Sequence, residues 1–222
     1  MHDVMLDYQL PTGTKVNVEY TYYNTPSTQH LISTLPTGEL HFDTDEHQRI
    51  NRWKFHLGQE HSLAGGWGLN YGVRYSLTND HSWQTFTSTG DNTAAHPADS
   101  YSRQNEDIVN IYAGTNGKIG QKVNFEASLA AEYYHSPAWH QWNVYPTLSL
   151  TYIPSSSHVL QLNFSSDKKF PDYWTLQSFT AYSNGGYNEV VGNPTLKPSS
   201  NYRTQLVYVL RHKYQFVAWF NY

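Results

Sequence analysis

Apolar and polar residues alternate one for one along much of this chain, and this pattern constrains the fold more than any other feature. In "VNFEASLAAEYYH" (123–135) the odd positions from Val123 to Tyr133 are apolar, while the positions between them include Glu126 and Glu132. The stretches "WGLNYGVRYSLT" (67–78) and "HVLQLNFSS" (158–166) alternate in the same way. Because successive side chains of a strand point to opposite faces, the alternation predicts strands with one apolar and one polar face.

The alternating runs predict an all-β fold, an antiparallel up-and-down meander of about ten strands. The predicted strands cover residues 3–10, 14–24, 47–60, 66–79, 102–115, 119–135, 138–153, 157–166, 201–211 and 213–222. Tight turns are expected at 11–13, 62–66, 116–120, 154–157 and 211–213, and longer loops at 25–46, 80–101 and 167–200, with one brief connection at Ser136-Pro137. A meander with tight turns at one end and long loops at the other is typical of an outer-membrane barrel.

Composition agrees with a barrel but does not decide the fold. The 222 residues include 19 Tyr and 7 Trp, yet the mean hydropathy is −0.65. Amphipathic aromatic residues in a polar chain suit an apolar band edged by water. A soluble Tyr-rich β-sandwich that binds a partner remains an alternative. The net charge of −4 and the scattered basic residues give no indication of a nucleic-acid-binding groove.

The sequence gives no positive signal for catalysis, a metal or a cofactor. It has no cysteine and no G-x-S-x-G nucleophile motif, so we expect no enzymatic activity. Histidines near predicted turns and an acidic cluster are the candidate metal ligands: His56, His61, His135 and His140, and Asp43, Asp45 and Glu46. The histidines lack a helical pair and the acidic cluster lacks EF-hand spacing, so solvated polar residues are the expectation.

The aromatic residues fall into two groups. Those on alternating strand positions are expected on the lipid face and in its interfacial girdles: Tyr20, Tyr22, Trp67, Tyr71, Tyr133 and Tyr208. Those in the predicted long loops are candidates for ligand contact, with ordinary loop packing as the alternative: Trp83, Phe86, Tyr101, Tyr173, Trp174, Tyr182 and Tyr187.

Three segments resemble a known family: "LDYQLPTGTKVNVEYTYYN" (6–24), "VYPTLSLTYIPSSSHVLQLNFSSDKKFPDYWTLQSF" (144–179) and "VGNPTLKPSSNYRTQLVY" (191–208). They are similar to the barrel of TonB-dependent outer-membrane receptors, in particular the outer-membrane β-barrel branch of Bacteroidetes-type bacteria. The Phe170-Pro171-Asp172-Tyr173 run fits the family's Pro-aromatic segment, although "LQSF" (176–179) lacks the usual proline. A structural motif that opens the next strand fits without change, namely Gly192, Asn193, Pro194, Leu196 and Pro198.

The resemblance implies active uptake of a scarce nutrient across the outer membrane of a Gram-negative bacterium. The expected partners are outer-membrane lipid, an unidentified extracellular ligand, and TonB, reached through an N-terminal plug that this chain lacks. A ferric siderophore, a glycan and a peptide remain open as ligands. An adhesive or structural barrel that binds a partner without transport is the alternative function.

The family's larger barrel also implies that residues 1–222 are one segment of the wall. Strand 3–10 is then expected to pair with an earlier strand and strand 213–222 with a later one. The alternative is a closed ten-stranded barrel in which these two strands pair with each other.

The alternation and the loop lengths predict orientation as well. Leu69, Leu129, Leu162 and Leu206 should face lipid, whereas Arg74, Glu126, Gln161 and Gln205 should face the lumen. The long loops should be extracellular and the tight turns periplasmic.

Overall fold

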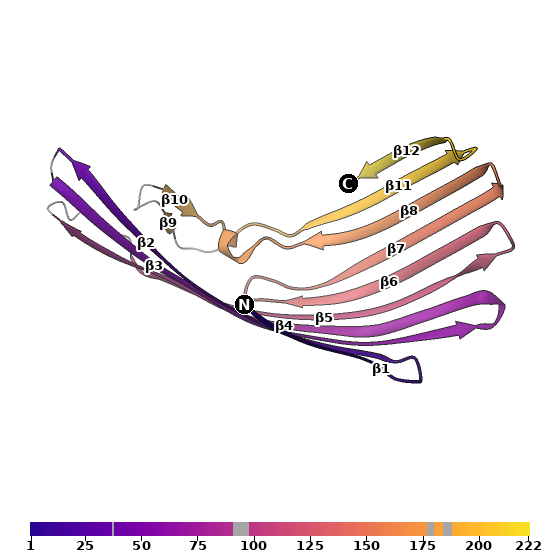
Figure 1. Cartoon of the computed structure of the whole chain (residues 1–222), viewed down its shortest axis with the longest axis horizontal. Helices are drawn as coiled ribbons and strands as arrows, with labels where there is room; N and C mark the ends of the chain where they lie inside the picture. Colours follow the sequence, from indigo (N-terminus) through magenta and orange to yellow (C-terminus); the bar gives the residue numbers. More distant parts are fainter. Residues whose placement is uncertain (37, 91–97, 177–179, 184–187) are drawn as a thin grey trace.

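A ten-stranded antiparallel sheet dominates the computed structural model, which describes residues 1–36, 38–90, 98–176, 180–183 and 188–222 (Figure 1). Its strands, in spatial order, are β1 (His2–Gln9), β2 (Lys15–Leu35), β3 (Gly38–Leu63), β4 (Trp67–Gly90), β5 (Ser100–Ile119), β6 (Val123–His135), β7 (His140–Ser155), β8 (His158–Lys169), β11 (Ser199–Leu210) and β12 (Tyr214–Asn221). Two 3-10 turns, η1 (Ala64–Gly66) and η2 (Tyr173–Leu176), and a separate two-stranded sheet of β9 (Thr180–Ser183) and β10 (Asn188–Val191) complete the described part.

The predicted meander is confirmed. All ten predicted strands are present, and each pairs with its neighbour in the chain, except that β8 pairs with β11 across the segment holding β9 and β10. The tight connections β1–β2, β3–β4, β5–β6, β7–β8 and β11–β12 gather at one end of the sheet, on the right in Figure 1. The strand ends that the remaining connections join lie at the opposite end, so the sorting of connections by end is confirmed too.

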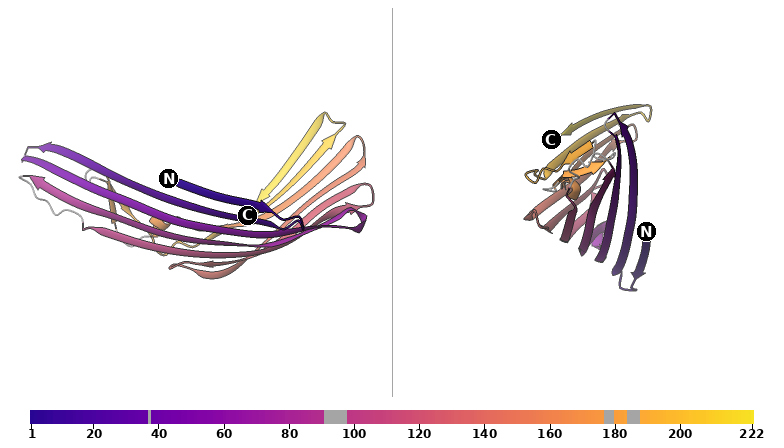
Figure 2. Two further views of the ribbon diagram at one scale, coloured as in Figure 1. Left: turned by 60° about the horizontal axis from the view of Figure 1, so that its bottom comes forward. Right: turned by 90° about the vertical axis from the view of Figure 1, so that its left-hand side faces the viewer.

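Two of the predicted long loops are wrong in extent. Most of 25–46 is strand, because β2 and β3 stay paired as far as Leu35 and Gly38, and half of 80–101 belongs to β4, which runs to Gly90. These extensions of β2, β3 and β4 (residues 25–35, 38–48 and 82–90) form an arm that projects beyond the other strands (Figures 1 and 2). Sequence alternation reports only a strand with one apolar face, whereas the arm carries many polar residues on both faces. The arm is therefore paired strand in which apolar and polar residues do not alternate, so the sequence pattern did not identify it.

The register separates apolar and polar side chains onto two faces. One row of cross-strand neighbours is Val16, Leu57, Val73, Ile111, Ala131 and Val144, and the next row, on the opposite face, is Asn17, His56, Arg74, Asn110, Glu132 and Asn143. The four leucines predicted to face lipid share the apolar face, and the four polar residues predicted to face the lumen share the other. The six strand aromatics expected on the lipid face also lie on the apolar side.

The polar face is the inner face of a curved sheet. The end-on view in Figure 2 shows the strands as an arc, with the segment between β8 and β11 on its inner side. That segment contacts the polar face, since the ring of Phe170 stacks on that of Tyr134 with 3.7 Å between centroids. The apolar face is therefore the outer one, and many of its side chains are exposed, such as Ile111 and Leu129 at 53% each.

The outer apolar residues form a belt of membrane height. On β6 the belt runs from Val123 to Tyr133, which is about 33 Å along a strand at roughly 3.3 Å per residue. Strands inclined at about 40° reduce this to about 25 Å, the height of the apolar band of outer-membrane barrels. Aromatic residues edge the belt, with Tyr20 and Trp53 near the arm and Trp67 against Phe125 near the tight turns.

The sheet is not closed. Among the described residues, β1 pairs only with β2 and β12 only with β11, so each of these two edge strands has one unpaired side. The alternative of a ten-stranded barrel closed between these two strands is therefore wrong. In the described part of the chain, no helix has the length and apolar character needed to cross a membrane.

Candidate functional site

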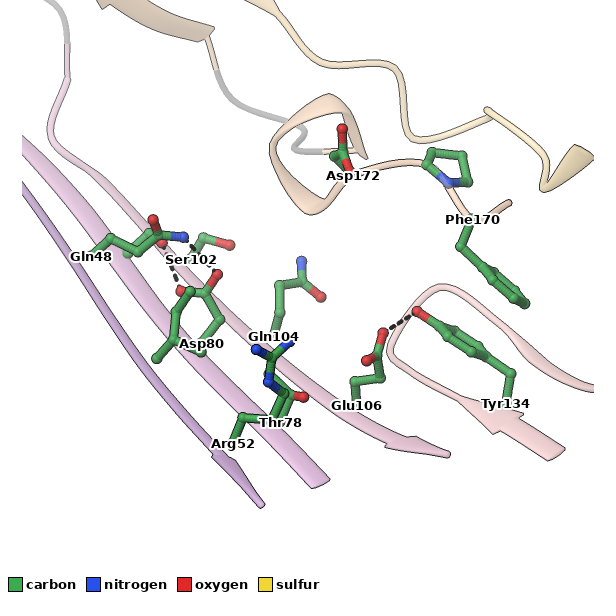
Figure 3. Close-up of a pocket in the computed structure, with 13 residues that line it drawn as sticks. Gln48, Arg52, Thr78, Asp80, Ser102, Gln104, Glu106, Tyr134, Phe170 and Asp172 are labelled. Atoms are coloured by element: carbon green, nitrogen blue, oxygen red, sulfur yellow. Dashed lines mark hydrogen bonds between the residues drawn. The ribbon is translucent and has the colours of Figure 1, made fainter. Parts of the chain in front are cut away.

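A polar pocket lies on the inner face where the arm leaves the sheet (Figure 3). Its floor is a grid of three strands by three rows of paired residues: Gln48, Ser82 and Ser102; Ile50, Asp80 and Gln104; and Arg52, Thr78 and Glu106. The pocket has a volume of about 620 Å³, and the segment that follows β8 covers it with Phe170, Pro171 and Asp172. Since residues two apart on a strand share a face, the floor consists of residues at alternate positions of the three strands, all of them polar except Ile50.

Asp80 is the most buried charged group of the floor, at 5% exposure. Its carboxylate accepts hydrogen bonds from Gln48 Nε2 at 2.9 Å and from Ser82 Oγ at 3.0 Å. These bonds offset the cost of removing a carboxylate from water and hold it in one orientation. Arg52 Nε is buried nearby and has no hydrogen-bond partner among the described residues.

An aromatic cluster forms one wall of the pocket. Tyr134 is 3% exposed, its hydroxyl donates to Glu106, and its ring lies nearly parallel to that of Phe170. Trp139 packs against Phe170 with 5.6 Å between ring centroids. The β6–β7 turn holds Trp139 in place, since the hydroxyl of Ser136 accepts hydrogen bonds from the amides of Ala138 and Trp139.

Hydrogen bonds of the returning segment fix the cover of the pocket. The carbonyl of Asp172 accepts from the amide and the hydroxyl of Thr175, and the carbonyl of Thr175 accepts from the amide of Asn193 at 2.6 Å. The Asn193 side chain in turn accepts from the amide of Thr195. The motif of Gly192, Asn193, Pro194, Leu196 and Pro198 thus forms a turn that ties η2 to the start of β11.

The pocket combines hydrogen-bonding groups with excess negative charge. It presents three carboxylates, those of Asp80, Glu106 and Asp172, against the single guanidinium of Arg52. The side chain of Gln104 points into the pocket (Figure 3), Asp172 lines it, and neither side chain makes a hydrogen bond to another described residue, so both are available to a ligand. Carboxylates, amides and an aromatic wall suit a ligand rich in hydroxyl or amino groups better than an anion.

Of the aromatic residues proposed for ligand contact, the side chains of Trp83, Phe86 and Tyr101 are described, and none of the three lines the polar pocket. Trp83 and Tyr101 are cross-strand neighbours on the outer face, and Tyr101 is 70% exposed. Phe86 is on the inner face of the arm, 6% exposed and packed against Phe42, a position that favours packing over direct ligand contact. Tyr173 and Trp174 fall in η2 and Tyr182 in β9, while Tyr187 is outside the described residues.

Sequence reasoning missed the pocket itself. The segments 48–52, 78–82 and 102–106 are polar at nearly every position, so they show no alternation, and nothing in the sequence indicated the register that brings their residues together. Phe170, which covers the pocket, stands in a motif singled out by resemblance, although its contact with Tyr134 could not be read from that motif.

Histidines and acidic residues considered as metal ligands are dispersed. The rings of His135 and His140 lie 4.6 Å apart, and Asp107 is 3.5 Å from His135. Within the described ranges, no group of three or more histidine or acidic side chains has an arrangement that could hold a metal ion.

Comparison with known proteins gives one family match and several structural matches. The model of the outer membrane protein beta-barrel family matches residues 11–222. No curated protein matches the chain.

The structural matches cover nearly all of this chain. In the FpvAI–pyocin S2 complex the TM-score is 0.56 at 11% identity, over 93% of this chain and 29% of that one. The unliganded ferric citrate transporter FecA matches with a TM-score of 0.55 and 14% identity, over 93% of this chain and 31% of that one. Pseudomonas aeruginosa FpvA bound to a heterologous pyoverdine matches with a TM-score of 0.53 and 10% identity, over 99% of this chain and 32% of that one. These identities establish the shared fold alone, and the chain spans about a third of the length of the structures it matches.

Proposed function

Since the chain belongs to the outer membrane protein beta-barrel family, we propose that it forms one segment of the wall and outer loops of a TonB-dependent receptor for nutrient uptake. The chain lies in the outer membrane of a Gram-negative bacterium, and its family is not enzymatic. A plug inside the completed barrel would respond to TonB, and strands from beyond β1 and β12 would close the wall, because free sheet edges are costly in hydrocarbon.

The observation that carries the proposal is the polar pocket beside the arm. It opens on the inner face, at the end of the sheet with the longer connections, and Gln104 and Asp172 have free hydrogen-bonding capacity there. A ligand captured by the outer loops would meet this pocket before it entered the lumen. The excess of carboxylates favours a glycan or a cationic peptide over an anionic ferric chelate, because like charges repel in a partly buried site.

We expect the double variant Gln104→Ala/Asp172→Asn to lower affinity for a bound neutral oligosaccharide or cationic peptide about tenfold or more, since it removes one neutral and one charged hydrogen bond. Calorimetric titration of the protein purified from outer membranes would measure the affinity. The matched control is Asp7→Asn/Gln9→Ala, which changes the same residue types on β1 and should leave the affinity unchanged. Equal losses in both variants would contradict a role for the pocket.

Transport distinguishes this proposal from an adhesive barrel. Uptake of the labelled ligand should stop in cells that lack TonB, whereas binding to the cell surface should persist. Uptake that continues without TonB would contradict the receptor function. Binding without any uptake would favour the adhesive alternative.

Sidedness has its own test, helped by the absence of cysteine from the chain. We expect a cysteine at Ala138, exposed in the β6–β7 turn, to react with a membrane-impermeant maleimide on intact cells. A cysteine at Ser156, exposed in the β7–β8 turn, should react only after the outer membrane is permeabilised. The reverse labelling pattern would overturn the orientation, because these turns lie at opposite ends of the sheet.

A further inference from the structure

Three basic side chains form a row on the outer face, just beyond the apolar belt. Arg49 of β3 pairs with His81 of β4, which pairs with Arg103 of β5. Adjacent strands lie about 4.8 Å apart, so the two guanidinium groups originate roughly 10 Å apart across one continuous surface. We call Arg49, His81 and Arg103 the basic row.

No described residue forms an ion pair with the arginines of the basic row. Arg49 and Arg103 are both exposed. The next row toward the belt is neutral and consists of Asn51, Asn79 and Asn105. Arg49 and Arg103 carry like charges on one face, on either side of His81, and an anion between them would offset their repulsion. The surface is therefore suited to an anionic group supplied from outside.

The depth of the row corresponds to lipid headgroups. Arg49 lies four residues beyond Trp53, the aromatic residue that ends the belt on β3. At about 3.3 Å per residue and an inclination of about 40°, this is about 10 Å above the edge of the hydrocarbon. Long arginine side chains that reach back toward the membrane bring their charges into the headgroup layer.

Aromatic rings follow on the far side of the basic row. His47, Trp83 and Tyr101 are paired across the same three strands, and the rings of His47 and Trp83 lie 4.2 Å apart. Tyr101 leaves most of its ring uncovered. Flat aromatic surfaces pack against the apolar faces of sugar rings, while guanidinium groups bind phosphate through two parallel hydrogen bonds.

From this order of side chains we propose that the outer face binds a phosphorylated glycolipid of the outer leaflet, with phosphate on Arg49 and Arg103 and sugar against Trp83 and Tyr101. This site is separate from the inner pocket, and it uses the extracellular orientation given under Proposed function. The two sequence-derived aromatic candidates on the outer face thus contact membrane lipid, not the transported ligand.

The test quantifies lipid A that stays bound to the protein purified from outer membranes, by mass spectrometry. The double variant Arg49→Gln/Arg103→Gln should retain about tenfold less lipid A than the unchanged protein, because two charge-assisted contacts are lost. The matched control Arg203→Gln/Arg211→Gln removes the same charge from the inner face of β11 and from the β11–β12 turn, and should retain the normal amount. Equal retention in the two double variants would overturn the proposal.

Further arms identify the source of the phosphate. Rebinding should require bisphosphorylated lipid A, and dephosphorylated lipid A or phosphatidylglycerol vesicles should bind at least about tenfold more weakly. Displacement of bound lipid A by millimolar inorganic phosphate would show a free-anion site and overturn the glycolipid assignment. Loss of ligand uptake with normal lipid A retention would refute only the transport function, whereas reversed cysteine labelling would refute the orientation that both proposals share.

Discussion

Replacing Ala131 with arginine is expected to lower the free energy of unfolding in a lipid bilayer by about 1–2 kcal/mol, between the cost of an arginine at the midplane of the apolar band and its cost at the interface. Ala131 lies between Ile111 and Val144 on the outer face, three residues from the middle of the belt on β6. An arginine at this position must either lose its hydration or thin the surrounding bilayer, and both cost free energy.

The neighbouring Ala130 provides a matched control. It pairs with Tyr112 and Tyr145 on the polar face, beside a second polar cavity, and an arginine there faces the lumen. Ala130→Arg should change the free energy of unfolding by no more than about 0.5 kcal/mol, as for other surface changes. Urea unfolding of the protein in phospholipid vesicles measures both variants. If Ala130→Arg proved the more harmful of the two, the assignment of the faces would be wrong.

Replacing Gly72 with alanine is expected to destabilise the sheet by about 1–3 kcal/mol, as overpacking does in a filled site. An added Cβ would lie 2.5 Å from the carbonyl oxygen of Leu57 and 2.6 Å from the hydroxyl of Tyr112. The side chain of Tyr112 covers this glycine. Its hydroxyl forms a hydrogen bond with His56 Nε2 at 2.8 Å, and its ring lies under the guanidinium of Arg74. A side chain at position 72 must displace both the neighbouring backbone and this cluster.

Gly68, on the same strand and face, should tolerate the same change. Its added Cβ would meet the side-chain oxygen of Asn116 at 2.6 Å, and a flexible amide can rotate away, whereas a backbone carbonyl cannot. Gly68→Ala also restricts the unfolded chain, so we expect a change between neutral and about 1 kcal/mol of stabilisation. Thermal or urea unfolding compares the two variants directly. Similar losses at both positions would show that β4 needs glycine for backbone reasons unrelated to Tyr112.

The arm shows the limit of sequence patterns in this protein. Alternation is clear at 53–57 and 67–77 because the outer face of these parts of β3 and β4 contacts lipid, and lipid accepts only apolar side chains. Beyond the belt the same strands pair for many more residues, but Thr28, His30 and Asp43 occupy the outer face and bond to one another or to their neighbours. Backbone hydrogen bonding does not depend on side-chain polarity, so the strand ends could not be predicted there.

The sequence by itself determined the strands, their order, the two faces and the end at which the tight turns lie. Each of these depends on local rules, namely the two-residue period of a strand and the short turns that join antiparallel neighbours. The open edges, the arm, the pocket and the basic row were decided by tertiary structure. Glu106 meets Tyr134, and Arg49 approaches Arg103, only through the register between strands, because pairing sums interactions over the whole length of each strand.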